Sequence, residues 1–259
     1  MARCDCRGRV FLAASGVGLA CVVGVLAGCG SSSSKATAST AISSETSSSS
    51  SPAASPSVSP ASEAQLTKIV LQPSDFPAGW QHTPYSSDPA TDAAGNAADA
   101  AFAKCLGVPN SETDKVAEGH SGDFDQGDAE ISSDATSFRS QSVVDADAAA
   151  MQSAKASPCA EQLVRQTLTG AVPAGGTIES VSFKITPGSG GGPTNVVATG
   201  TGSFKISVSG NSAEGYVSVT FITGPMIETD VTAFNVGAPV PTPLTDSLVA
   251  AVASRAAHP

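Results

Sequence analysis

Three histidines and six cysteines are the most reactive side chains in this chain of 259 residues. His82, His120 and His258 are far apart in the sequence, and none belongs to a His-Glu-x-x-His zinc motif. The sequence also lacks a Gly-x-Ser-x-Gly nucleophile elbow and a phosphate-binding loop. We therefore expect a protein that is not an enzyme. Because serines are abundant, a Ser-His-Asp triad stays open as the alternative.

An acidic stretch at residues 119–128 is the one candidate for a cation site. It contains Asp123, Asp125 and Asp128 and superficially resembles a calcium loop. The spacing of an EF-hand fails, since Gly127 occupies a position that should supply an oxygen and no Glu follows at the closing position. We expect a solvated loop here, and neither a metal nor another cofactor.

The first cysteine with an assignable chemistry is Cys29. Three arginines within the first nine residues precede an apolar run over Val10–Ala27, which is the pattern of a secretory signal. At the end of this run, Leu26-Ala-Gly-Cys29 resembles the lipobox of bacterial lipoproteins. The resemblance implies a diacylglyceryl thioether on Cys29, removal of residues 1–28, and attachment to the outer face of the cell membrane.

Two other interpretations of this segment stay open. The run is short for a membrane-spanning anchor, which needs about 20 apolar residues. Cleavage after a different small residue would instead release a soluble secreted protein. The position of Cys29 directly after small residues favours lipidation, and two or more acyl chains anchor a protein stably where one chain would not.

Export also decides how the remaining cysteines are used. Three of the six lie within residues 1–28, so Cys105 and Cys159 are the only unmodified ones left beside Cys29. An even pair in an oxidising compartment predicts a single disulfide. The alternative is two free or metal-binding thiols, although no Cys or His lies at ligand spacing from either.

The charge of the chain excludes some partners. Removal of residues 1–28 takes away three Arg and one Asp, which leaves 10 basic and 22 acidic residues and a formal charge of −12. Such a surface repels phosphate backbones, so we expect no binding to nucleic acid. It offers no basic patch for anionic lipids either, so attachment to the membrane depends on the acyl chains.

Composition divides the exported chain into two parts. Residues 29–62 are rich in Ser, Thr, Ala and Pro and bury too little apolar surface to fold, so we expect a disordered tether. A flexible chain of this length spans about 30 Å and lifts a domain clear of the membrane. Residues 63–259 are long enough for a single globular domain with its own core.

The periodicity of that domain predicts an α+β fold. Alternating apolar residues in the C-terminal half, joined by short Gly-containing links, indicate an antiparallel meander whose strands have one apolar and one wet face. The expected strands cover residues 129–139, 178–186, 196–208, 215–223 and 227–236. The expected helices cover residues 63–71, 97–106, 142–156, 159–169 and 242–255, and residues 81–96 are expected to form a loop. We thus expect an antiparallel sheet of about four to five strands packed on helices, with one disulfide.

Two short segments carry a further resemblance. Asp75-Phe-Pro-Ala-Gly-Trp80 and Phe102-Ala-Lys-Cys-Leu-Gly107, together with the lipobox and tether, resemble actinobacterial lipoproteins of the cell envelope. The polar strand, second cysteine, closing strands and terminal helix resemble the extracytoplasmic sensor domain of PknH-type kinase receptors. The resemblance implies an α+β fold with a cleft and two disulfides, of which this chain can form only one. It supplies no ligand and no functional residue.

Two functions fit these features. In the first, the lipid-anchored domain is a non-catalytic binding module for a small apolar ligand or lipid, held between the meander and its helices. The alanine-rich helix at 142–156 would leave the gap, and Trp80, Phe183, Phe204 and Phe221 would line it. Close packing, with Trp80 at the edge of the core, is the alternative. In the second, the domain is a sensory or interaction accessory that contacts another envelope protein.

Overall fold

The computed structural model describes residues 59–172, 175–188 and 193–259. The expected signal segment, Cys29 and the expected tether up to residue 58 lie outside the described residues. Among the helices that are described, none is both long and apolar enough to cross a membrane.

Nine strands form one sheet, so the expectation of about four to five strands was too low. The strands are β1 (Gln81–Thr83), β2 (Lys115–His120), β3 (Asp123–Gln126), β4 (Ala129–Ser132), β5 (Asp134–Phe138), β6 (Gly176–Pro187), β7 (Val196–Val208), β8 (Asn211–Gly224) and β9 (Ile227–Val236). They are paired in the order β1-β3-β4-β9-β8-β7-β6, and β5 joins β2 to β9. All pairs are antiparallel, which confirms the expected meander in its β6–β9 part.

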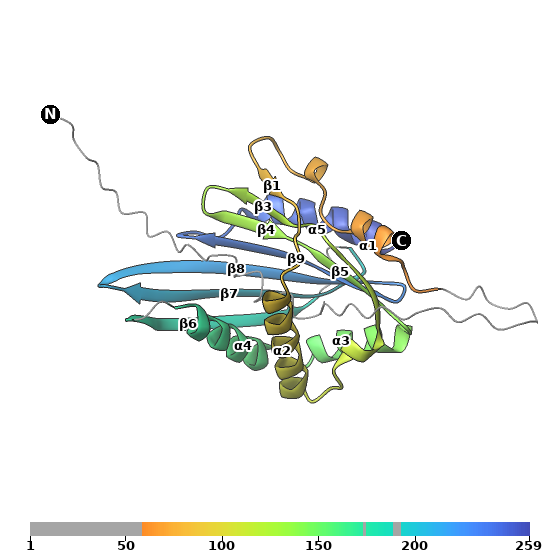
Figure 1. Cartoon of the computed structure of the whole chain (residues 1–259), viewed down its shortest axis with the longest axis horizontal. Coiled ribbons are helices and arrows are strands. Elements are labelled where there is room, and N and C mark those ends of the chain that lie inside the picture. Colours follow the sequence, from red (N-terminus) through yellow and green to blue (C-terminus); the bar gives the residue numbers. More distant parts are fainter. Residues whose placement is uncertain (1–58, 173–174, 189–192) are drawn as a thin grey trace, which may run out of the picture.

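Five α-helices and two short 3-10 turns among the described residues complete the fold. They are α1 (Glu63–Ile69), η2 (Pro73–Asp75), α2 (Pro89–Leu106), η3 (Ser111–Asp114), α3 (Gln141–Met151), α4 (Ala156–Ala171) and α5 (Thr242–Ala256). Helices α2, α3 and α4 cover one face of the sheet, and α1 and α5 cover the other (Figure 1). The expected α+β class is therefore confirmed.

The extra strands are short and polar, which explains why periodicity missed them. No residue of β1 is buried, and β3 buries only Phe124. These strands consequently lack the apolar alternation that predicts a half-buried strand. The expected strand at 129–139 divides at Ser133, and the acidic stretch at 119–128 contributes to β2 and β3 rather than forming a loop throughout.

Two helix boundaries differ from expectation because proline can begin a helix as well as end one. Helix α2 starts at Pro89, within the expected loop, because the Asp88 carboxylate accepts a hydrogen bond from the Ala90 amide and caps the helix. Pro158 was expected to follow a helix ending at 156. It instead lies in the first turn of α4. The N–H groups of a first turn have no partner within the helix, so the N–H that proline lacks is not needed there.

The disulfide between Cys105 and Cys159 is present, as expected. It joins α2 to α4, and the two Cα atoms are 5.7 Å apart. Cys159 lies in the first turns of α4, and Cys105 in the last turn of α2, immediately before Gly107 ends that helix in a left-handed conformation. The disulfide therefore fixes the C-terminal end of α2 to the N-terminal end of α4.

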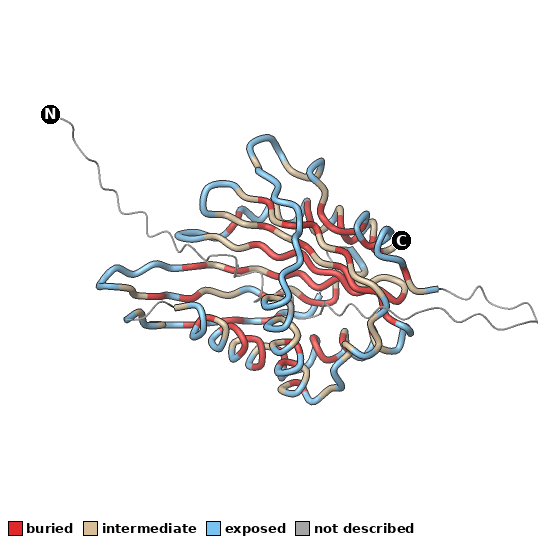
Figure 2. Tube along the Cα trace, viewed as in Figure 1, coloured by how far each residue is buried: buried red, intermediate tan, exposed pale blue. Residues whose placement is uncertain are grey.

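The first seven residues of strand β9 are all buried, so this part of the strand is buried on both faces (Figure 2). Ile227, Val231 and Ala233 pack with the core under α1 and α5. On the alternate face Glu228 and Asp230 pair across to Thr223 and Phe221 of β8, so they face the side of α2, α3 and α4. The expected wet face of this strand is thus buried, and it carries carboxyl groups.

Candidate functional site

Two aspartates occupy positions on α2 and α3 where apolar residues would be expected. Asp99 lies three and seven residues before Phe102 and Leu106, on the buried side of α2. Asp147 lies between Val144 and Met151 on the buried side of α3. Their exposed fractions are only 6% and 7%, which is rare for aspartates without a partner.

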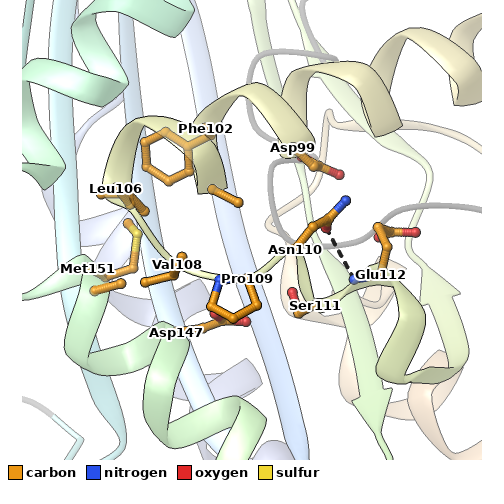
Figure 3. Close-up of a pocket in the computed structure, with 12 residues that line it drawn as sticks. Asp99, Phe102, Leu106, Val108, Pro109, Asn110, Ser111, Glu112, Asp147 and Met151 are labelled. Atoms are coloured by element: carbon orange, nitrogen blue, oxygen red, sulfur yellow. Dashed lines mark hydrogen bonds between the residues drawn. The ribbon is translucent and has the colours of Figure 1, made fainter.

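Both aspartates line a small pocket between α2, η3 and α3 (Figure 3). Phe102, Leu106, Val108 and Met151 lie on one side of it, Asp99, Asn110, Ser111 and Glu112 lie on the other, and Asp147 lies near Pro109 between the two groups (Figure 3). Its full lining is Asp99, Phe102, Ala103, Leu106, Val108, Pro109, Asn110, Ser111, Glu112, Asp147, Ala150 and Met151. Water-sized groups can be centred within a volume of ≈ 20 Å³, which is room for about one water molecule. Because Pro109 and Asn110 are exposed, the pocket can be reached from solvent.

The Asp99 carboxylate has no hydrogen-bond donor for either of its oxygens. Burial, and then the nearby charge of Glu112, raise the pKa of Asp99 to about 8. Lys115 acts in the opposite direction, but its ammonium already lies 2.9 Å from Glu112 Oε2 and 2.7 Å from Glu118 Oε1. The surroundings of Asp99 therefore contain more negative than positive charge.

Asp147 is held in place by two neighbours but keeps one oxygen without a partner. Burial raises the pKa of Asp147, and interactions with the Ser111 hydroxyl and the Glu228 carboxyl group act in the opposite direction. Oδ2 of Asp147 and both carboxyl oxygens of Glu228 have no hydrogen-bond donor. Burial, and then the charge of Asp147, raise the pKa of Glu228 well above the ordinary value. Glu228 consequently keeps its proton and donates it toward Asp147, because two adjacent carboxylates cannot both ionise at low cost.

More carboxyl groups lie beyond this pair on β9 and β5. Asp230 is buried and accepts a 2.9 Å hydrogen bond from the Thr232 hydroxyl, and burial raises its pKa well above the ordinary value. Asp134 lies 2.7 Å from Nδ1 of His120, which stacks on Tyr85. These groups have partners, so the unpartnered oxygens at the pocket belong to Asp99 and Asp147.

The arrangement costs stability in the free protein. A buried polar group without a hydrogen bond costs about 1–3 kcal/mol, and an ionised one costs more. Native proteins keep few such groups, and each one that remains calls for an explanation. A pocket with carboxylate oxygens and no donor is chemically suited to a ligand that brings a positive charge and N–H donors.

The aromatic residues expected to line an apolar gap lie elsewhere. Phe183, Phe204 and Phe221 are 6–7% exposed and belong to the core between β6–β8 and α4. The Phe183 ring lies so close over Gly200 that a Cβ there would be 2.7 Å from it. Trp80 packs instead with the core on the opposite face of the sheet, 5.2 Å from the Phe76 ring. The structure therefore brings the three phenylalanines together and leaves Trp80 apart from them.

Comparison with known proteins adds no family. No family model matches the chain, and no curated protein matches it significantly. Within the described ranges, no three His, Cys, Asp or Glu side chains are arranged to hold a metal ion. The case for a function therefore depends on the pocket itself.

Proposed function

We propose that the protein is a lipid-anchored, extracytoplasmic and non-catalytic domain that binds a partner protein of the cell envelope. The observation that supports this best is the pocket lined by two buried aspartates, since Asp99 has no donor for either oxygen and Asp147 has none for Oδ2. Groups that reduce the stability of the free domain are expected where a partner satisfies them. The signal pattern, Cys29 and the tether supply the anchor and the location.

Carriage of a small apolar ligand receives less support. A carrier site needs roughly 300–1,000 Å³ lined mainly by apolar groups. The pocket has space for about one water molecule and contains carboxylates. Phe183 packs over Gly200 and Gly202 of β7, and Phe204 packs over Gly215 of β8. Phe221 belongs to the same core cluster as these two and the buried residues of α4. A protein surface that delivers one side chain into the pocket fits these dimensions better.

Cross-linking in intact cells tests the proposal. A photo-reactive amino acid at Pro109, an exposed residue of the pocket lining, should give a discrete cross-linked product with one envelope protein. The matched control is Ser182, an exposed residue of β6 that is not part of the pocket lining. Identical products from both positions, or none from Pro109, would show that the pocket is not an interface.

The anchor has its own test. Cys29→Ala should abolish labelling by a fatty-acid probe and leave the uncleaved precursor, because the thiol that receives the lipid is gone. The double variant Cys105→Ser/Cys159→Ser is the control and should still be labelled. Persistent labelling of Cys29→Ala would mean that the lipobox interpretation is wrong.

A further inference from the structure

We propose that residues 89–99 of α2 form a gate over the acidic side of the sheet, and that this gate unwinds when the Asp99 carboxyl group loses its proton. The rest of the helix, residues 100–106, stays in place. The gate needs no partner protein, so it stands apart from the proposed function. Three features of the fold carry it: the burial pattern of α2, the position of the disulfide and the charges around Asp99.

The burial pattern divides α2 into two parts. None of the side chains described in residues 89–98 is buried, so the first ten residues of the helix contribute little to a core. Phe102 and Leu106, in the second part, belong to the core beneath α2 and α4. Asp99 stands at the junction as the first buried residue of the helix. Because helices in proteins are held mainly by the packing of an apolar face, the first part depends on how well Asp99 is accommodated.

The two ends of α2 are held to different extents. The Cys105–Cys159 disulfide ties the C-terminal end to α4. At the other end, residues 84–90 are all exposed, and Gly95 lowers the helix propensity of the first part. Unwinding that begins at the N-terminal end can therefore proceed to Asp99, and it stops in the part that the disulfide and the core hold.

The closed gate offers the Asp99 carboxyl group nothing that would stabilise its charge. Both of its oxygens lack a hydrogen-bond donor, and both are closed to solvent. An ionised carboxyl group in such surroundings is strongly disfavoured. Since water cannot reach these oxygens in the closed gate, the charged group can be hydrated only if the helix around it moves.

The charged groups beneath the gate are mostly negative. Lys115 is engaged by Glu112 and Glu118, and His120 lies 2.7 Å from Asp134, so neither cation is left for Asp99. On α4, Lys155 donates a hydrogen bond to the Leu106 carbonyl oxygen, at the far end of α2. The groups whose charges act on Asp99 or on its acidic neighbours are Glu112 of η3, Lys115, Glu118 and His120 of β2, Asp134 of β5, Asp147 of α3, and Glu228 and Asp230 of β9.

Opening of the gate is coupled to release of a proton. Burial, and then the charge of Glu112, raise the pKa of Asp99 to about 8 in the closed gate, whereas a hydrated aspartate has a pKa of about 3.9. Between these values the closed gate binds one more proton than the open gate. The closed gate is therefore favoured most at low pH. The equilibrium constant for opening rises by up to tenfold per pH unit and levels off above about pH 8.

Hydrogen exchange of the full chain, followed by mass spectrometry, tests the gate. Protection factors already allow for the intrinsic effect of pH on exchange. For the amides of residues 93–99 they should fall by up to tenfold per pH unit between about pH 5 and about pH 8. The amides of β8 should be better protected than these at every pH, because they open only with the core. In Asp99→Asn the protection of residues 93–99 should no longer vary with pH. The matched control is Asp145→Asn, on the exposed side of α3, which should behave as the wild type does.

Three results would overturn the gate. Equal protection of residues 93–99 and β8 at every pH would show that the domain opens only as one cooperative unit. Protection of residues 93–99 that does not vary with pH in the wild type would show that no proton is released on opening. An equal fall with pH in the wild type and in Asp99→Asn would show that a group other than Asp99 controls the helix.

Discussion

Asp99→Asn should make the domain more stable near neutral pH. In the folded state Asp99 has a pKa of about 8, while an aspartate in the unfolded chain has a pKa of about 3.9. Between these values the folded protein binds one more proton than the unfolded chain. The stability that Asp99 contributes is therefore complete at low pH and is lost as the pH rises, by up to about 1.4 kcal/mol per pH unit. A neutral amide of the same shape avoids this loss.

Urea unfolding of the full chain at several pH values from about 5 to about 8 measures this effect. The free energy of unfolding of Asp99→Asn should exceed that of the wild type by an amount that grows with pH, reaching at most about 4 kcal/mol at pH 7. Asp145→Asn, an exposed change on α3, should stay within about 0.5 kcal/mol at every pH. A difference for Asp99→Asn that does not vary with pH would contradict the burial of an unpartnered carboxyl group.

Loss of the disulfide should have a comparable effect of opposite sign. Cys105 and Cys159 are 54 residues apart, and closing such a loop is worth about 4 kcal/mol in the chain-entropy model, as an upper figure. Cys105→Ser/Cys159→Ser should therefore lower the free energy of unfolding by roughly 2–4 kcal/mol.

A reductant supplies the control for this prediction. Dithiothreitol should lower the stability of the wild type to that of the double variant, and it should not affect the double variant further. If the two proteins unfold at the same urea concentration without reductant, the disulfide does not constrain the chain as proposed.

Local sequence signals predicted the parts of the fold in which one face of an element is apolar. The strands β6–β9 and the helix α5 follow from alternation or from an apolar stripe, and the disulfide follows from the count of cysteines in the chain that is expected after export. The short strands β1 and β3 do not, because they have almost no buried apolar residue of their own. Their position is set by pairing with neighbours distant in the sequence, which a local pattern cannot contain.

The candidate site was not predicted, although part of its signal was present. Asp99 lies in register with Phe102 and Leu106, and Asp147 with Val144 and Met151, so each acid interrupts an apolar stripe. An aspartate in the first half of a helix more commonly stabilises the helix through its charge, so the position of Asp147 alone does not indicate a buried carboxyl group. No local signal indicated that Glu228 of β9 is buried beneath Asp147. A polar residue that alternates with apolar residues in a strand normally faces water.

The central claim is that Asp99 is buried without a hydrogen-bond donor and therefore keeps its proton near neutral pH. The most direct measurement follows the carboxyl carbon of Asp99 by NMR as the pH is changed. The account predicts a pKa of about 8 for this group. A pKa near the ordinary 3.9 would contradict it.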